Sequence, residues 1–126
     1  MKIEHFALNV EDPQAMAQWY VANLGMSVVR GDNEPPYVTF LAAAGGGSMI
    51  ELYANPQGEF LDYGRFQALT FHIAFAVADI TQERDRLLQA GARADGEIST
   101  TARGDKLAML RDPWGHAIQL VQRTSP

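Results

Sequence analysis

Two histidines and two further polar residues recur along the chain at nearly the same spacing. His5 and Glu51 are 46 residues apart, and His72 and Gln119 are 47 residues apart. Imidazole nitrogens, carboxylate oxygens and amide oxygens can all coordinate divalent metals. Two histidines with one carboxylate form a triad that leaves coordination positions open for a substrate. These four candidate ligands predict a site for one divalent metal, namely nickel, zinc, cobalt, iron or manganese.

Taken singly, each candidate ligand has a simpler interpretation, as a structural strand histidine or an exposed strand carboxylate. The repeat in the surrounding sequence changes this interpretation. Residues 5–12 read HFALNVED and residues 72–79 read HIAFAVAD, at an offset of 67. Ile50-Glu51-Leu52 matches Ile118-Gln119-Leu120 at an offset of 68. Two matches at nearly one offset indicate a duplicated unit with the candidate ligands at equivalent places.

Both halves show the same order of elements, which is a strand, a helix and three more strands. The first helix runs from the cap Asp12 to the terminator Gly25, and the second from Asp79 to Gly91. The predicted strands cover 3–10, 26–30, 37–42 and 48–54 in the first half, and 69–77, 93–99, 106–111 and 117–122 in the second.

The pattern predicts one α+β domain over residues 1–126, made of two βαβββ modules. Module 1 covers 1–54, a linker covers 55–68, and module 2 covers 69–122.

Strand parity places the candidate ligands on one kind of face. Alternate side chains of a strand point to opposite faces of its sheet. Phe6, Leu8 and Val10 share the apolar face that should pack on a helix, so His5 falls on the opposite face. The same parity holds for the other three candidate ligands. Small neighbours leave space beside them, which favours a lined cavity over a filled core. These neighbours are Ala7, Ala74, Ala76 and Ala117.

Composition narrows the class of protein. The chain has 126 residues, no cysteine and a formal net charge of −5. A disulfide framework, an iron–sulfur cluster and a cysteine nucleophile are excluded. An acidic chain without a basic run is a poor binder of nucleic acid or membrane surfaces. We expect a cytoplasmic domain whose partner is a small-molecule substrate, with no nucleic acid and no membrane.

The sequence resembles the vicinal oxygen chelate superfamily, which contains glyoxalase I, bleomycin-resistance proteins and extradiol dioxygenases. The resemblance rests on the paired modules, the strand histidines His5 and His72, and the ending Asp112-Pro113-Trp114-Gly115…Ile118-Gln119-Leu120, and it covers residues 1–122. It implies a curved, barrel-like mixed sheet with the helices on the outside. It also implies that the metal ligands are His5, Glu51, His72 and Gln119.

The resemblance implies a lyase or isomerase of the glyoxalase I type, acting on a small substrate that chelates the metal through vicinal oxygens. In such isomerases a glutamate of the site removes a proton next to a carbonyl, and the metal acts as a Lewis acid. The fourth ligand is commonly glutamate, but here it is Gln119, whose amide cannot take a proton at neutral pH. Glu51 is therefore the candidate catalytic base.

Two other functions stay open. His5, His72 and Glu51 form a triad suited to iron and oxygen, as in an extradiol-dioxygenase-type oxygenase. Bleomycin-resistance-type relatives use the same cavity to sequester an antibiotic without metal, although they generally lack the ligand set. Relatives of this length are usually homodimers, with each site either within one chain or shared across the dimer.

Candidate substrate contacts are aromatic or apolar residues near the predicted cavity. The connection over 57–66 carries three aromatic residues and an arginine, and loops near a site often determine specificity. Packing of these aromatics at the module junction or a dimer interface is the alternative. The candidates are Tyr37, Tyr53, Phe60, Tyr63 and Met109.

Overall fold

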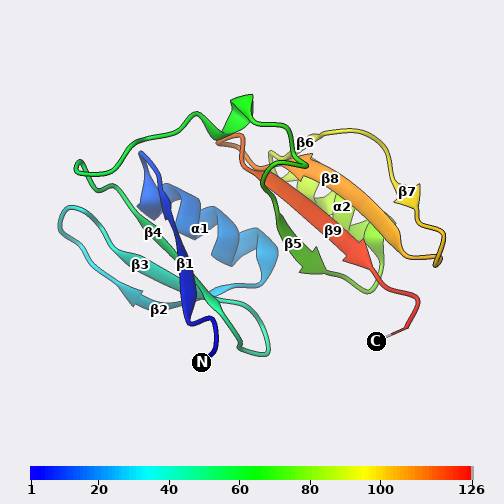
Figure 1. Ribbon diagram of the computed structural model, residues 1–126, viewed down its shortest axis with the longest axis horizontal. Helices are drawn as coiled ribbons and strands as arrows, with labels where there is room; N and C mark the ends of the chain where they lie inside the picture. The colour runs from blue at the N-terminus through cyan, green and yellow to red at the C-terminus, as the bar shows by residue number, and fades with distance from the viewer. Residues whose placement is uncertain (126) are drawn as a thin grey trace. The chain divides into compact units, whose positions relative to one another are not determined.

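The computed structural model describes residues 1–125, so the last residue of the predicted domain, 126, lies outside the described part. The chain forms two compact units, which meet in sequence between Leu61 and Asp62. This boundary falls inside the predicted linker, 55–68. Figure 1 shows the elements of both units, each of which is described separately below.

The first unit holds one helix and a four-stranded mixed sheet in the order β1-β4-β3-β2. β1 is parallel to β4, while β3 is antiparallel to both β4 and β2. A parallel neighbour requires a crossover, and the helix α1 begins that connection. The elements are β1 (His5–Asn9), α1 (Pro13–Leu24), β2 (Ser27–Gly31), β3 (Thr39–Ala42) and β4 (Met49–Tyr53).

The second unit repeats this topology, with the order β5-β9-β8-β6 and β7 also paired to β8. β5 is parallel to β9, as β1 is to β4. A short 3-10 helix, η1, precedes the sheet. The elements are η1 (Tyr63–Arg65), β5 (Ile73–Ala76), α2 (Ile80–Gln89), β6 (Arg93–Ala94), β7 (Ser99–Thr100), β8 (Lys106–Arg111) and β9 (Ala117–Gln122).

Both helices begin at the aspartates that the sequence indicates. The Asp12 side chain accepts from the backbone N–H of Ala15 at 3.1 Å, and the Asp79 side chain accepts from Gln82 at 3.1 Å. Each bond satisfies a backbone donor that the first helical turn leaves without a partner. Gly25 ends α1 in the left-handed conformation, with φ 67°.

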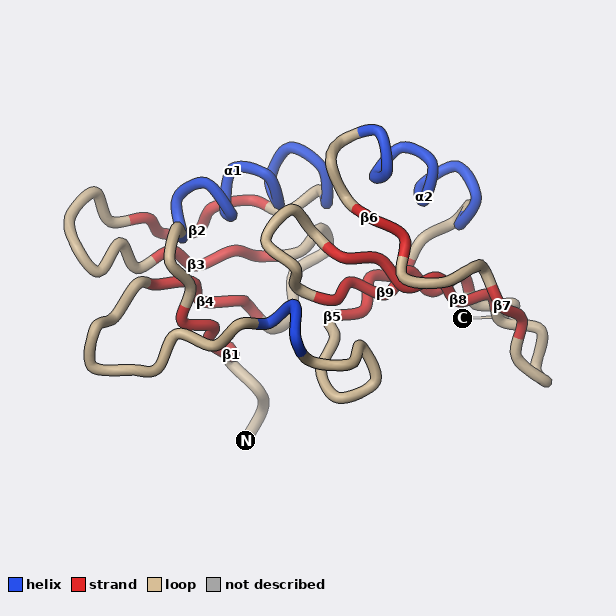
Figure 2. The backbone as a smooth tube through the Cα atoms, turned by 90° about the horizontal axis from the view of Figure 1, so that it is seen from above, coloured by secondary structure: helices blue, strands red, loops and turns tan. Residues whose placement is uncertain are grey.

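Each helix covers one face of its own sheet (Figure 2). In the first unit Tyr20 of α1 and Leu41 and Leu52 of the sheet are completely buried. In the second unit Leu87 of α2 is 1% exposed, and Leu110 and Ile118 of the sheet are completely buried. Full burial of a side chain of this size contributes roughly 1.5–3 kcal/mol. The two apolar cores therefore fix the sheets and leave the opposite strand faces available for a site.

The expected α+β class and the two βαβββ modules are confirmed, with two corrections in module 2. The predicted strand 93–99 is instead two short strands, β6 and β7, because Gly96 takes a positive φ of 98° between them. The strand predicted over 69–77 is shorter, since β5 covers only Ile73–Ala76. None of the helices among the described residues is long and apolar enough to cross a membrane.

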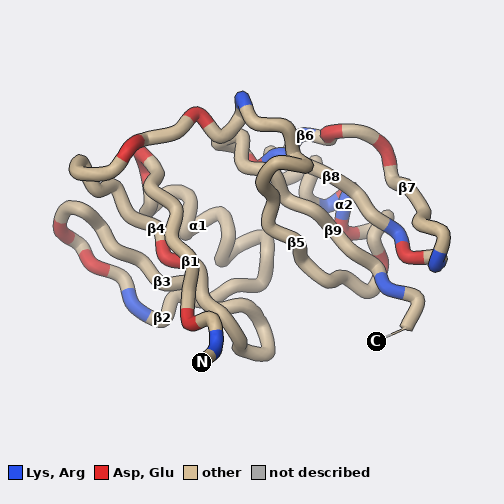
Figure 3. Tube along the Cα trace, in the orientation of Figure 1, with Lys and Arg blue, Asp and Glu red and all other residues tan. Residues whose placement is uncertain are grey.

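Lysines and arginines are scattered along the described trace and interspersed with acidic residues (Figure 3). One arginine has a clear structural role in the second unit. The Arg111 guanidinium donates to the carbonyl oxygens of Phe66 at 2.8 Å and Gly115 at 3.2 Å, and it pairs with Asp95 at 3.0 Å. Arg111 thus ties the segment after η1 to the turn between β8 and β9.

Candidate functional site

His5 and Glu51 meet on the face of the first sheet that α1 does not cover. His5 begins β1 and Glu51 lies in the middle of β4, where it pairs with Ala7. The distance from His5 Nε2 to Glu51 Oε1 is 3.5 Å. The His5 side chain is 36% exposed and that of Glu51 is 15% exposed. The pair is therefore accessible from solvent, and Glu51 is the more enclosed partner.

The His5 ring is held from two sides. Its Nδ1 hydrogen-bonds to a carboxylate oxygen of Glu4. Its edge meets Phe40 of β3 in a T-shaped contact, with 5.2 Å between ring centroids and 86° between planes. Phe40 is also the register partner of Glu51 on the same face. These contacts orient Nε2 toward Glu51.

His72 and Gln119 occupy the equivalent places in the second unit. Gln119, half-buried in the middle of β9, pairs with Ala74 of β5 and with Met109 of β8. His72 directly precedes β5, two residues before Ala74, so strand parity puts it on the Gln119 face. The His72 Nδ1 lies 2.8 Å from the carbonyl oxygen of Ala68.

The donor chemistry of these residues fits a divalent metal. The Ala68 carbonyl oxygen only accepts hydrogen bonds, so His72 Nδ1 donates to it, whereas His5 lies between two carboxylates, with Glu4 at Nδ1 and Glu51 3.5 Å from Nε2. Within residues 1–125, no group of three or more histidine, aspartate or glutamate side chains gathers in a metal-holding arrangement. The first unit brings His5 and Glu51 within 3.5 Å of each other, and the second unit holds His72 and Gln119.

Two of the candidate substrate contacts lie on the strand faces that carry Glu51 and Gln119. A third lies in a loop, at a residue with positive φ. Tyr53 shares the face of Glu51 in β4, and Met109 shares the face of Gln119 through their pairing. Tyr37 lies in the connection between β2 and β3 with φ 60°. A bulky residue with positive φ costs of order 1–3 kcal/mol, and such positions cluster at functional sites.

Phe60 and Tyr63 lie in the connection between the modules, and Tyr63 makes a packing contact. The Tyr63 ring lies 4.3 Å from the ring of His116, at the turn between β8 and β9. Both residues belong to the second unit, so this contact packs the start of that unit against its own turn. Phe60 is 42% exposed.

That turn also holds a buried polar pair that was not predicted from the sequence. Asp112 is fully buried, and its Oδ1 accepts from the backbone N–H groups of Trp114 and His116 at 2.9 Å. His116 is 3% exposed, and its Nδ1 lies 3.2 Å from Asp112 Oδ2. The Asp-Pro-x-Gly pattern predicts this turn. His116, the residue after the glycine, is not part of an apolar pattern in the sequence, so the pattern does not predict its burial. Glu4 was also missed, and its position beside His5 was the available indication.

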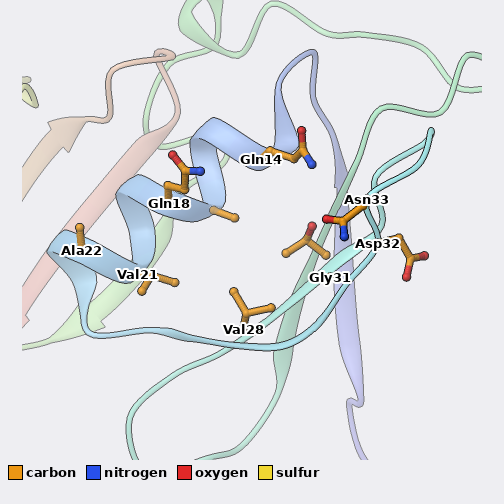
Figure 4. Close-up of a pocket in the computed structure, with 10 residues that line it drawn as sticks. Gln14, Gln18, Val21, Ala22, Val28, Gly31, Asp32 and Asn33 are labelled. Carbon is orange, nitrogen blue, oxygen red and sulfur yellow. The ribbon is translucent and has the colours of Figure 1, made fainter.

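A groove of about 470 Å³ lies on the helix-bearing face of the first sheet, between α1 and β2. Figure 4 shows Val21 of the helix opposite Val28 of the strand, with Gln14 and Gln18 along the same helix. Thr39 also lines the groove, and its parity in β3 is opposite to that of Phe40. The groove is therefore separate from the face that carries His5 and Glu51.

A family model described as the Glyoxalase/Bleomycin resistance protein/Dioxygenase superfamily matches residues 2–120. The chain is 30% identical to a lactoylglutathione lyase of Salmonella typhimurium, covering 97% of this chain and 93% of the relative. It is 33% identical to an ethylmalonyl-CoA/methylmalonyl-CoA epimerase of Cereibacter sphaeroides, covering 96% and 97%.

Two solved structures show the same fold. A superfamily member from Sphaerobacter thermophilus matches with a TM-score of 0.77 at 17% identity, covering 98% of both chains. TnmS3, an antibiotic binding protein from a Streptomyces species, matches with a TM-score of 0.73 at 20% identity, covering 98% of this chain and 97% of its own. At these identities the similarity concerns the fold alone.

Proposed function

Because the chain belongs to the glyoxalase/bleomycin-resistance/dioxygenase superfamily, we propose that it is a metal-dependent lyase or isomerase. The observation that carries this proposal is the 3.5 Å approach of His5 Nε2 and Glu51 Oε1 on an accessible sheet face. His5, Glu51, His72 and Gln119 would hold the metal through imidazole, carboxylate and amide donors. A divalent metal supplies Lewis-acid stabilisation of negative charge that develops on substrate oxygens.

Glu51 is the proposed catalytic base. It is the one carboxylate among the four candidate ligands, since Gln119 carries an amide that cannot take a proton at neutral pH. Its partial enclosure between Phe40 and His5 limits the water around it, and a substrate bound on this face would meet its oxygens directly. Glu51 would take the proton from a carbon next to a carbonyl and return it to the same or the adjacent carbon.

The names of the relatives suggest a substrate class. Lactoylglutathione and methylmalonyl-CoA both carry a hydrogen on the carbon next to a thioester carbonyl. Both also carry a second oxygen close enough to that carbonyl to chelate a metal. Removal of this hydrogen is a step that Glu51 could perform on either compound. The proposed substrate is therefore a small carbonyl compound with such a hydrogen and a chelating pair of oxygens.

The proposed active form is a homodimer with a small-molecule site at each pairing of modules. Each unit contains only two of the candidate ligands, His5 with Glu51 or His72 with Gln119. A four-ligand site therefore requires a first unit to meet a second unit. That second unit is provided either by the same chain or by the partner chain.

The test combines metal content with hydrogen exchange. Protein loaded with nickel, cobalt, zinc, manganese or iron is incubated in D₂O with lactoylglutathione or methylmalonyl-CoA, and deuterium uptake at the carbon is followed by NMR. We expect about one metal per chain, exchange with one substrate of this class, and loss of exchange in Glu51→Gln. Glu11→Gln, at an exposed carboxylate outside the site, should retain exchange.

Three outcomes would redirect the assignment. Iron binding with oxygen uptake on catechols would favour the oxygenase. Absence of bound metal after loading with each ion would leave the antibiotic-sequestering function, to be tested by small-molecule binding. Exchange that persists in Glu51→Gln would exclude Glu51 as the base.

A further inference from the structure

The two histidines fix their protonated nitrogen with different partners. His5 Nδ1 donates to the carboxylate of Glu4, whereas His72 Nδ1 donates to the backbone carbonyl of Ala68 at 2.8 Å. His72 Nδ1 therefore carries the proton, and for His5 the Glu4 contact at Nδ1 is shorter than the 3.5 Å approach of Glu51 to Nε2, so it favours the proton on Nδ1 of the neutral ring. The difference matters for experiment, because a substitution can remove the Glu4 carboxylate but cannot remove the Ala68 carbonyl.

The backbone carbonyl of Glu4 accepts from the N–H of Met49 in β4 at 3.0 Å, while its side chain reaches the His5 ring. Glu4 precedes β1, and its side chain is 61% exposed. Its exposed position gives no packing reason for a carboxylate there. The carboxylate is nevertheless directed at the one ring nitrogen of His5 that does not face Glu51. A carboxylate behind an imidazole raises the electron-donor strength of the other nitrogen and fixes the ring.

Phe40 completes the support of the His5 ring. Its T-shaped contact, at 5.2 Å between centroids, restricts rotation of the imidazole from the side of β3. Glu4 then selects which nitrogen points toward Glu51. With both contacts in place, His5 Nε2 and Glu51 Oε1 form a pre-arranged pair of donors 3.5 Å apart.

We propose that Glu4 is a positioning residue that holds His5 in the Nδ1–H tautomer and so strengthens the His5–Glu51 pair as a metal-binding half-site. The metal part rests on the proposed function above, whereas the tautomer part concerns the chain alone. Glu4 contacts neither substrate nor metal and acts through His5.

The first experiment reads the tautomer directly in metal-free protein. Nitrogen-15 NMR of the imidazoles distinguishes the two neutral tautomers at about pH 8, above the usual histidine pKa of about 6.5. We expect His5 in the Nδ1–H form in the parent protein and a mixture of both forms in Glu4→Ala. Glu4→Gln should retain the Nδ1–H form, because its amide oxygen can still accept. His72 is the internal reference and should not change.

The second experiment measures affinity for zinc and nickel ions by competition with a chelator. Glu4→Ala should weaken binding roughly tenfold, at the lower end of the effect of removing an outer hydrogen-bond partner of a ligand. Glu11→Ala, which removes an exposed carboxylate of the same module, should match the parent protein. The metal affinity of Glu4→Gln should lie between those of Glu4→Ala and the parent protein if the negative charge contributes beyond the hydrogen bond.

The outcomes separate the two proposals. An unchanged His5 tautomer in Glu4→Ala overturns the positioning role, whatever the metal affinity. An altered tautomer with unchanged affinity overturns the metal-strengthening part. If the parent protein binds no metal, the proposed function fails, while the NMR result still decides whether Glu4 positions His5.

Discussion

The side chain of Asn9 forms two hydrogen bonds with the backbone of Asn55. Its Nδ2 donates to the Asn55 carbonyl at 2.9 Å, and its Oδ1 accepts from the Asn55 N–H at 2.8 Å. Nδ2 also donates to the carbonyl of Glu59 at 3.0 Å. Asn9 lies at the end of β1, on the same strand face as His5. One amide thus ties the start of the connection between the modules to the strand that carries the first candidate ligand.

This arrangement leaves no room for a side chain at Gly58. A Cβ added there would lie 2.9 Å from Asn9 Nδ2, closer than real Cβ contacts. We expect Gly58→Ala to displace the Asn9 amide and to lower the free energy of unfolding by about 1–3 kcal/mol, the cost of leaving such polar groups unsatisfied. Urea denaturation measures this change.

Gly31→Ala is the matched control for Gly58→Ala. A Cβ at Gly31 would meet only the Val28 side chain, at 3.4 Å. Its effect should stay within about 0.5 kcal/mol, as for other surface substitutions. Equal effects of the two variants would show that the Asn9 contacts do not restrict position 58.

The buried carboxylate of Asp105 should make the free energy of unfolding depend on pH. The backbone hydrogen bond from Thr124, followed by the Arg123 side chain, holds the pKa of Asp105 below its ordinary value of 3.8. Because the folded state has the lower pKa, the stabilisation is present above the unfolded pKa. It is lost as the pH falls through the folded pKa.

The corresponding measurement is denaturation at a series of pH values from about 6 to about 3. We expect Asp105→Asn to be less stable than the parent protein near pH 6, with the difference shrinking as the pH falls. Asp85→Asn, at an exposed position of α2, serves as the control. A difference that stays constant over the whole range would show that the ionised form of Asp105 is not what the Thr124 and Arg123 contacts stabilise.

The repeat and the strand parity predicted much of the fold and the place of Glu51. Buried and half-buried residues alternate along β4 as predicted, because a covered sheet face imposes it, whereas in β9 Ala117 and Val121 are buried on the face of Gln119 as well. The partnership of His5 with Glu51 follows from the register of β1 with β4. Glu4 is the neighbour of His5 in the sequence and Asn9 shares its strand face, but the contacts that these two side chains make depend on side-chain and loop geometry that has no periodicity.

The interruption of the strand predicted over 93–99 could not be predicted from the sequence either. Its composition is compatible with a strand, but the backbone at Gly96 takes a positive φ, so the strand is interrupted. The pairing of both fragments with β8 preserves the sheet. Local composition thus predicted a strand in this segment but not the break.

A shared site can be recognised by mixing inactive chains. If His5 and Glu51 of one chain meet His72 and Gln119 of its partner, a heterodimer of His5→Ala and His72→Ala chains has one intact site. Equal mixing makes about half of the dimers heterodimers, so activity should return to about one quarter of the parent value. Native mass spectrometry verifies that the subunits have exchanged. Complete exchange without any recovery of activity would place each site within one chain.

The amide at position 119 offers the most direct test of the ligand set. Gln119 lies half-buried between Ala74 and Met109, and Gln119→Glu keeps its shape while adding a negative charge. If its oxygen coordinates the metal, the carboxylate should bind a divalent cation more tightly than the neutral amide. We expect roughly a tenfold gain in zinc or nickel affinity, about 1.4 kcal/mol. Competition with a chelator measures the gain.

Gln18→Glu makes the same charge change on the exposed surface of α1, and its affinity should equal that of the parent protein. The comparison separates coordination from the general attraction of an added negative charge, which is weak at a distance in salt. A gain confined to Gln119→Glu would identify position 119 as a ligand. Equal affinities in all three proteins would remove it from the ligand set, and His5, Glu51 and His72 would remain as a three-residue triad with open positions for substrate.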